Sequence, residues 1–210
     1  MKNIFLLSII ASLFTACSSP SASTEAGDAN ESVIFEASSS MYAVNASEST
    51  VAWTGSKPTG DRHMGTVAIK QGKIALSDGT ISGGSFILDM TQMSITDEGM
   101  DEETKAKLLG HLTTTDFFEV DKFPTASFSV TGSTVDSLTG NLTIKDITKS
   151  ITVPYTLEVG AANIIANASF SIDRTQWDVK FNSGNFFENL GEYLINDAVQ
   201  FDINLVANEK

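Results

Sequence analysis

Cysteine is nearly absent from this 210-residue chain, in which Cys17 stands alone. A single cysteine excludes an internal disulfide and any zinc site with cysteine ligands in the rest of the chain. Histidine is almost as rare, since the chain contains only His63 and His111. A metal or acid–base site that uses both histidines is one interpretation of this pair. A loop histidine and a histidine favoured by a helix C-terminus are the simpler interpretation.

Basic residues are also few. The chain has 13 lysines and arginines against 26 aspartates and glutamates, which gives a net charge of −13. A field of this sign repels nucleic acids and anionic lipid surfaces, so we expect no nucleic-acid partner. The acidic residues Asp97, Glu98 and 101–103 lack the spacing of a calcium-binding loop. They are better explained as the solvated start of a helix.

Sequence motifs of catalysis are missing as well. The chain has no Gly-x-Ser-x-Gly elbow, and Gly83-Gly84 lies in a strand-like pattern without the spacing of a phosphate-binding loop. We therefore expect no enzymatic activity, no cofactor and no metal. A pair of catalytic carboxylates stays open as an alternative, because such residues need not be adjacent in sequence.

The longest hydrophobic run, Ile4–Phe14, has eleven residues and follows Lys2. It is too short to cross a hydrocarbon core of about 30 Å as a helix, and it is typical of a secretory signal peptide. Residues 13–17, Leu-Phe-Thr-Ala-Cys, resemble a bacterial lipobox. We expect residues 1–16 to be removed and Cys17 to be lipidated. The chain would then be anchored to a membrane of the cell envelope, facing the periplasm.

Residues 17–40 differ in composition from the remainder of the mature chain. From residue 18 to residue 40 there are eight serines and four acidic residues, and no basic residue. Such a composition resists folding and predicts a disordered tether, which as a flexible coil would span roughly 25–30 Å root mean square. Residues 41–210 have the length of one domain.

Apolar and polar residues alternate through most of residues 41–210. This period of two predicts strands with one apolar and one wet face, and such faces favour antiparallel pairing. Residues 71–73, 77–79 and 146–148 carry turn chemistry between neighbouring runs. We count eight or more strands, and several are long, which predicts an all-β barrel or deep sandwich.

Residues 101–112 break this alternation and predict a helix. Asp101 is a suitable N-cap, acidic residues fill the first turn, and Leu108, Leu109 and Leu112 form a narrow apolar stripe. Residues 182–196, which include Phe186-Phe187, predict a loop with a helical turn.

Six short motifs, in order, make the domain recognisable. Each is weak alone, but together they extend over about 160 residues from Tyr42 to Ala207. They are Val51-Ala52-Trp53-Thr54-Gly55 with His63-Met64-Gly65; Gly83-Gly84-Ser85-Phe86-Ile87-Leu88-Asp89-Met90; Gly110-His111-Leu112 leading to Thr115-Asp116-Phe117-Phe118-Glu119 and Lys122-Phe123-Pro124-Thr125-Ala126-Ser127-Phe128; Gly140-Asn141-Leu142-Thr143-Ile144-Lys145-Asp146-Ile147-Thr148-Lys149; Ile172-Asp173-Arg174-Thr175-Gln176-Trp177; and Ala198-Val199-Gln200-Phe201.

These motifs resemble the YceI-like, or polyisoprenoid-binding, family. The resemblance implies a lipocalin-like, extended antiparallel β-barrel of about eight strands with one or two short helices. It also implies a long apolar cavity that holds an isoprenoid or a similar amphiphilic chain. Asp146 stands where the family often has glycine, a change that turn geometry tolerates.

The inward apolar residues are the candidate ligand contacts, although an eight-stranded barrel can also be filled by its own side chains. The candidates are Trp53, Val67, Ile69, Phe86, Leu88, Phe128, Val130, Leu142, Ile144, Val153, Tyr155, Phe170, Ile172 and Phe201.

Three further residues are candidates for the rim of the cavity: His111, Arg174 and Trp177. Asp173 and Arg174 with Trp177 could clamp an anionic head group. A structural role at the barrel end, with the arginine stacked on an aromatic ring, is the favoured interpretation.

The sequence thus predicts an envelope lipoprotein that binds a polyisoprenoid, quinone or fatty-acid chain for transport, storage or sequestration. Its expected partners are this hydrophobic ligand and a membrane, reached through the lipid anchor. Two alternatives remain, a stress-response or interaction module with a filled barrel and an enzyme that acts on a bound lipid. Monomer and homodimer both stay open.

Overall fold

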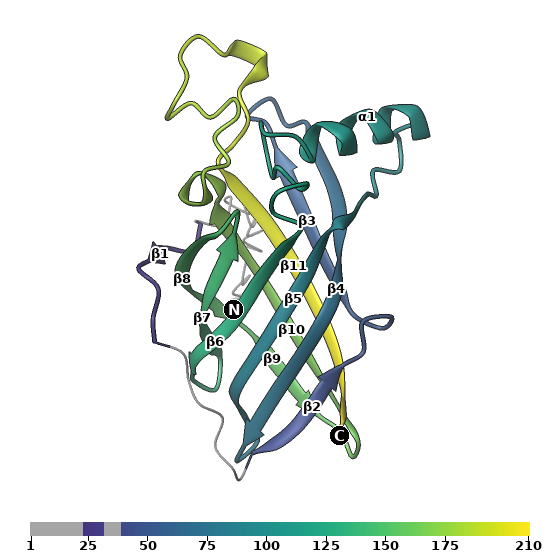
Figure 1. Cartoon of the computed structure of the whole chain (residues 1–210), viewed down its shortest axis with the longest axis vertical. Coiled ribbons are helices and arrows are strands. Elements are labelled where there is room, and N and C mark those ends of the chain that lie inside the picture. Colours follow the sequence, from purple (N-terminus) through teal and green to yellow (C-terminus); the bar gives the residue numbers. More distant parts are fainter. Residues whose placement is uncertain (1–22, 32–38) are drawn as a thin grey trace, which may run out of the picture.

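The computed structural model describes residues 23–31 and 39–210, and strands dominate it (Figure 1). The strands are β1 (Ala26–Gly27), β2 (Ser40–Val44), β3 (Thr50–Ser56), β4 (Arg62–Ser77), β5 (Thr80–Ile95), β6 (Thr125–Ser133), β7 (Ser137–Ile144), β8 (Ile147–Pro154), β9 (Thr156–Val159), β10 (Asn163–Asp173) and β11 (Ala198–Glu209). The helices are α1 (Glu102–Leu112) and the 3-10 turns η1 (Arg174–Trp177) and η2 (Gly191–Tyr193).

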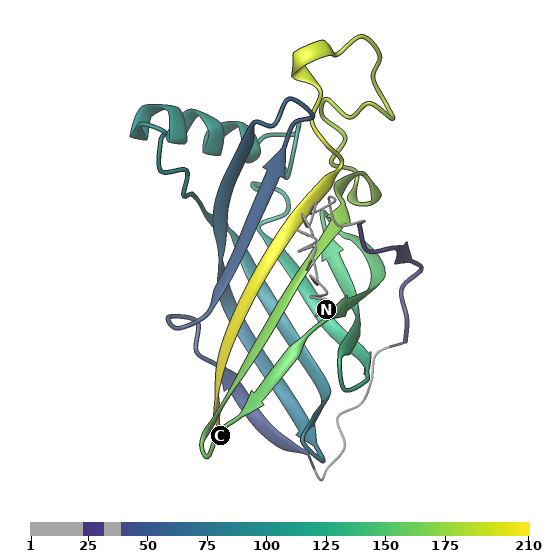
Figure 2. The same ribbon diagram turned by 180° about the vertical axis from the view of Figure 1, so that it is seen from behind.

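The strands form a closed antiparallel barrel (Figures 1 and 2). Both β2 and β3 lie between β4 and β11, so together they make one strand of the wall. β8 and β9 make another, because only Tyr155 separates them, and β8 pairs with β7 while β9 pairs with β10. Counted in this way the wall has eight strands. The predicted lipocalin-like barrel of about eight strands is therefore confirmed.

Strands β4 and β5 are 16 residues long and contain several bulges. The predicted turn at residues 71–73 is wrong, because Gln71 and Lys73 continue β4 and pair with Ile87 and Ser85 of β5. The ladder instead shifts register between Ile69 and Gln71. An extra residue of this kind bends a strand and changes which positions face inward. It produces a break in the alternation that resembles a turn.

Two of the predicted turns lie at real hairpins. Asp78 and Gly79 connect β4 to β5 with positive φ angles of 51° and 76°. The β7–β8 turn lies at Lys145 and Asp146, with φ angles of 50° and 59°, so it begins one residue earlier than predicted. Positive φ at both central residues is the geometry that matches the twist of a two-residue hairpin.

The predicted helix is confirmed as α1, which lies at the upper end of the barrel and projects to one side (Figure 1). Asp101 is its N-cap, and its carboxylate accepts a hydrogen bond from the Thr104 amide at 2.9 Å. Leu112 is buried, and Leu108 and Leu109 pack against the same apolar cluster. Within the described parts of the chain, none of the helices has the length and apolar character needed to span a bilayer.

The predicted disordered tether over 17–40 is wrong for residues 23–31, which lie against the barrel. Thr24 forms a bridge to Ile172 of β10, and Ala26–Gly27 pairs with β8. The side chain of Asn30 donates to the Ser150 hydroxyl at 2.7 Å. Among the described strands, β8 has no other partner on this edge. An open edge exposes unpaired N–H and C=O groups, so this polar segment has backbone groups to bind.

Candidate ligand-binding cavity

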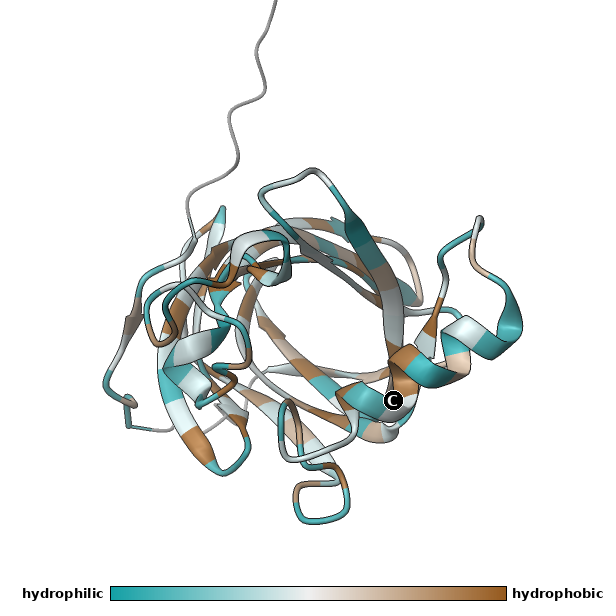
Figure 3. Cartoon of the chain, turned by 90° about the horizontal axis from the view of Figure 1, so that it is seen from above, coloured by the Kyte–Doolittle hydropathy of each residue, from teal (hydrophilic) through white to brown (hydrophobic). Residues whose placement is uncertain are grey.

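A cavity of about 240 Å³ lies inside the barrel, and apolar atoms form its surface. This volume exceeds that of an engineered cavity of about 150 Å³ that stays dry and binds benzene. Seen from above, hydrophobic and hydrophilic residues alternate along the strands that surround it (Figure 3). The alternation in the sequence therefore separates a wet outer surface from an apolar inner one.

Two pairs of phenylalanines line the cavity from opposite walls. Phe86 of β5 pairs with Phe128 of β6, and their ring centroids are 6.4 Å apart. Phe170 of β10 and Phe201 of β11 stack with centroids 5.7 Å apart. In the strand order, β5 and β6 lie across the barrel from β10 and β11. Among the described residues, no ring contact joins one pair to the other, and the cavity is lined by both pairs.

The inward side chains of strand β11 also border open space. Val199, Phe201, Ile203 and Leu205 occupy successive inward positions and all line the cavity. Each is only partly buried, although β10 pairs alongside all four and β3 pairs alongside Phe201 and Ile203. Inward side chains of a filled barrel would be fully covered by their neighbours. Their remaining exposure therefore faces the cavity.

Buried side chains pack together toward the end of the barrel that is lower in Figure 1, where β2 lies. Tyr42, Leu76, Ile81, Leu138 and Tyr155 belong to one cluster there, and none of them exceeds 8% exposure. The Tyr155 hydroxyl donates to the carbonyl oxygen of Thr134 at 2.9 Å, and burial raises the pKa of this tyrosine. These side chains block the entry of a ligand from this end.

The upper end is built from loops and is less tightly packed. Trp53, Phe118, Ile195 and Asn196 line the cavity here, and all four are partly exposed. Phe118 comes from the segment after α1, and Ile195 and Asn196 come from the segment after η2. The mouth of the cavity is therefore formed by Trp53 of β3 and by the segments that follow α1 and η2.

Twelve of the fourteen predicted contact residues line the cavity. They are Trp53, Val67, Ile69, Phe86, Leu88, Phe128, Leu142, Ile144, Val153, Tyr155, Phe170 and Phe201. The placement of Val130 and Ile172 on the cavity wall is wrong. They are 4% and 2% exposed and pack in the buried cluster that also contains Tyr42 and Tyr155. Both face inward, but neighbouring side chains cover them.

Several further residues line the cavity that the alternation in the sequence does not predict. Met93 faces the cavity because a register shift places it opposite Val67, while Asp89 pairs with the adjacent Ala68. A second shift in the β4–β5 ladder places Ile81 inside as well. Phe117 and Phe118 contribute from outside any strand. The doubled phenylalanine was a visible signal, but its position depends on the path of the chain after α1.

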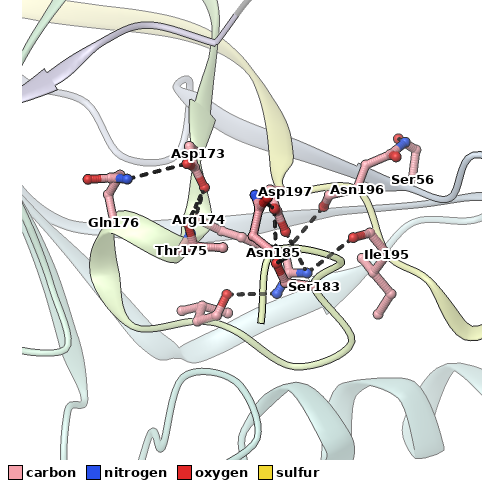
Figure 4. Close-up of polar contacts among 11 residues, drawn as sticks. Ser56, Asp173, Arg174, Thr175, Gln176, Ser183, Asn185, Ile195, Asn196 and Asp197 are labelled. Atoms are coloured by element: carbon pink, nitrogen blue, oxygen red, sulfur yellow. Dashed lines mark hydrogen bonds and ion pairs between the residues drawn. The ribbon is translucent and has the colours of Figure 1, made fainter. Parts of the chain in front are cut away.

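Arg174 lines the cavity but is not an exposed rim residue, since it is only 5% exposed. Its guanidinium donates to the carbonyl oxygens of Val179 at 2.7 Å, Asn196 at 3.2 Å and Ile195 at 3.3 Å (Figure 4). It also forms an ion pair with Asp197 at 3.3 Å. Burial lowers the pKa of Arg174, and the charge of Asp197 acts in the opposite direction. These bonds replace the predicted stacking on an aromatic ring.

The other two rim candidates have structural positions. Trp177 is fully buried, and its indole donates to the carbonyl oxygen of Leu142 at 3.1 Å, so its placement on the rim is wrong. His111 does not line the cavity. Its ring meets Phe117 and Phe181 edge-on, with centroids 5.1 and 4.9 Å apart. It thereby joins α1 to the segment that follows η1.

Several of the other polar candidates form ion pairs or hydrogen bonds. His63 lies 2.9 Å from the Asp97 carboxylate, which also accepts the amide of Met64. Glu102 and Glu103 form ion pairs with lysines of α1. In the portion of the chain that the structure describes, no three histidine, cysteine or acidic residues are grouped so that they could hold a metal ion.

These features define a class of protein, an antiparallel β-barrel closed at one end around an apolar cavity. More specifically, a family model for the YceI-like domain matches residues 42–207, and the chain belongs to this family. The predicted membership is therefore confirmed. No curated protein matches the chain.

Several solved structures share the fold. BcnA from Burkholderia cenocepacia is 18% identical with a TM-score of 0.56, and the match covers 78% of this chain and 98% of that one. A polyisoprenoid binding domain from Saccharophagus degradans, implicated in plant cell wall breakdown, is 14% identical with a TM-score of 0.57; coverage is 80% and 98%. The YCEI protein of Campylobacter jejuni is 17% identical with a TM-score of 0.50, and coverage is 70% and 81%.

Proposed function

We propose that this protein is an envelope lipoprotein that binds one long apolar chain, of polyisoprenoid, quinone or fatty-acid type, inside its barrel. Lipidated Cys17 anchors it to a membrane on the periplasmic side, and the barrel carries, stores or sequesters the chain. The protein acts as a binder and does not transform its ligand.

One observation carries this proposal: the inward rings of opposite walls do not meet. The pairs Phe86–Phe128 and Phe170–Phe201 each make contact internally, and the cavity lies between them. This argues against the alternative of an interaction module with a filled barrel. The surface of the cavity presents apolar atoms only, which supports a non-catalytic role for it.

The energetics are adequate without a polar contact. Burial of one methylene group contributes about 0.8 kcal/mol. A ligand with fifteen buried carbons would therefore gain roughly 12 kcal/mol, and a cost of about 4 kcal/mol for its loss of freedom would leave micromolar binding near −8 kcal/mol, whereas a shorter chain would bind more weakly. A site of this kind selects the width and length of a chain more than its chemistry.

A polyisoprenoid suits the shape of the cavity. The rings of Phe86, Phe128, Phe170 and Phe201 offer flat apolar surfaces to a chain of limited thickness. The similar fold of the Saccharophagus degradans polyisoprenoid binding domain supports this choice of ligand class.

The test compares two tryptophan substitutions on adjacent residues of β10. Ala168 lines the cavity, whereas Ser169 is exposed on the outer face. Ala168→Trp should fill the cavity and abolish binding of polyprenols, quinones and fatty acids, while Ser169→Trp should bind as the unaltered protein does. Native mass spectrometry of protein purified from its own host would detect the ligand, and circular dichroism would verify that both variants fold.

Two results would contradict the proposal. One is the absence of any copurified hydrophobic molecule together with no uptake of the three ligand classes. The other is equal binding by folded Ala168→Trp and Ser169→Trp. The anchoring part is tested separately by the intact mass of the mature protein, which should begin at Cys17 and carry acyl chains.

A further inference from the structure

Exposed aromatic residues gather on the loop beside the cavity mouth. Phe186 and Phe187 are each 50% exposed, and Tyr193 is 65% exposed. The loop that carries them projects beyond the upper end of the barrel (Figures 1 and 2). Exposed phenylalanine is unfavourable in water unless another surface covers it, and aromatic rings are enriched where proteins meet a membrane interface.

The base of this loop is held firmly to the barrel. Asp197 binds Arg174 on one carboxylate oxygen, and on the other it accepts hydrogen bonds from Ser183 at 2.9 Å and Asn185 at 2.8 Å (Figure 4). Asn196 donates from its side chain to Ser56 at the end of β3 at 2.9 Å. The aromatic tip is thus presented in a defined direction and is continuous with residues that line the cavity.

The N-terminal segment reaches the barrel close to the same end. The amide of Thr24 donates to the carbonyl oxygen of Ser171 at 2.6 Å, near the end of β10, just before η1. Cys17 precedes Thr24 by seven residues, which span at most about 25 Å when fully extended. From Ile172, where Thr24 forms its bridge, nine residues of β10 lead down to Asn163, a path of about 30 Å at roughly 3.3 Å per residue, whereas only Asp173 remains before the upper end of the strand. The segment from Cys17 therefore reaches the mouth more readily than the closed end, which favours an orientation with the mouth toward the membrane.

We propose that the loop of residues 182–194 inserts Phe186, Phe187 and Tyr193 into the interface of a phospholipid bilayer, so that the cavity mouth faces the membrane. This inference rests on the proposed function, because it takes Cys17 as the anchor. The bilayer is zwitterionic at the point of contact. The loop carries exposed Glu188 and Glu192, and the chain has a net charge of −13, so an anionic surface would repel it.

The experiment uses the lipidated chain, whose only native cysteine is acylated, so that an introduced cysteine is a unique labelling site. Glu188→Cys places a fluorophore on the loop, and Glu158→Cys places it on β9 near the closed end; both positions are exposed glutamates. Each protein is reconstituted in phosphatidylcholine vesicles that contain brominated lipid. The label at residue 188 should be quenched several-fold more than the label at residue 158.

A second variant tests the aromatic residues themselves. Phe186→Ser with Phe187→Ser in the Glu188→Cys background should remove most of the quenching. Equal quenching at residues 188 and 158, or quenching that persists without the two phenylalanines, would overturn the proposal. Protection of residue 188 from an aqueous quencher in native membranes, without bromolipid quenching, would overturn it in favour of a protein partner.

Ligand measurements separate this proposal from the proposed function. The double serine variant should bind a polyprenol in solution as the unaltered protein does, yet exchange it with vesicles about tenfold more slowly, because two rings no longer hold the mouth at the interface. An unchanged exchange rate would contradict the docking proposal alone. A failure of the unaltered protein to bind any ligand would contradict the proposed function. The quenching measurement would still decide whether the loop enters the bilayer.

Discussion

Close approaches of aromatic rings to glycines keep the cavity open at the scale of single residues. A Cβ atom on Gly140 would lie 2.2 Å from Cζ of Phe128, and one on Gly65 would lie 2.4 Å from Cζ2 of Trp53. Both rings therefore lie flat along the barrel wall, where a side chain at the neighbouring position would push them inward. The Nε1 of Trp53 is buried without a hydrogen-bond partner in this position, so a polar group is left unsatisfied.

Substitution of Gly140 should narrow the cavity. In Gly140→Ala the Phe128 ring has to move toward the interior, and we expect a destabilisation of about 1–3 kcal/mol together with weaker binding of long chains. Gly132→Ala in the same hairpin is the control, because its nearest neighbour would lie 4.0 Å away. Urea denaturation and ligand titration measure both effects, and similar losses in the two variants would refute this explanation.

Arg174 is the residue on which the mouth depends most. Arg174→Met removes a guanidinium that satisfies three carbonyl groups and the Asp197 carboxylate, and it leaves that charge without its partner. We expect a loss of about 3–5 kcal/mol in the free energy of unfolding. Arg62→Met, at an exposed arginine of β4, should change stability by less than about 0.5 kcal/mol. A small effect at Arg174 would show that the loop does not need this anchor.

At the scale of elements, the barrel wall is interrupted at Tyr155, where one strand of the wall is divided into β8 and β9. β9 pairs with β10 in the lower part, whereas Thr24 and β1 cover the edges of β10 and β8 farther up. Asn30 adds a reciprocal pair of hydrogen bonds with Asn141, each 2.8 Å long. Short polar segments of this kind protect a strand edge from pairing with other chains.

Helix α1 should lose its first turn in acid. Hydrogen bonds from the backbone and side chain of Thr104 lower the pKa of Asp101 in the folded state. The contribution of the ionised Asp101 cap to stability is therefore complete above the pKa of the unfolded state, about 3.9. This contribution is lost as the pH falls through the lower pKa of the folded state. The amide of Thr104, followed by NMR exchange, should lose protection in this range. Asp101→Asn still caps the helix but does not titrate, so its helix should lack this step. The same acid transition in both proteins would refute the assignment.

At the scale of the whole molecule, an apolar ligand should stabilise the barrel against unfolding. A ligand that binds only the folded state adds about 2.7 kcal/mol when its concentration is 100 times the dissociation constant. The melting temperature should therefore rise with the concentration of polyprenol in the unaltered protein and in Ser169→Trp, but not in Ala168→Trp. Thermal scans followed by circular dichroism measure this, and an equal rise in all three proteins would indicate binding outside the cavity.

Particular residues show how far the sequence could predict the site. Phe170 and Phe201 were placed correctly, because β10 and β11 pair without a bulge and alternation is enough. Met93 was missed, because a register shift reverses the inward parity of β5. Ile172 was misplaced, because an inward direction does not say whether a side chain meets a neighbour or an opening. Packing density around a position depends on the closure of the whole wall.

The sequence alone determined the faces of the strands that pair without bulges, the helix at residues 101–112 and the family, because these depend on the local period of apolar residues and on short motifs. Tertiary structure decided that the barrel is hollow, that Arg174 is buried and that residues 23–31 cover a strand edge. Each of these facts depends on contacts between segments far apart in the chain. Only the closed wall sets the distance across the interior, and that distance decides whether opposing side chains touch.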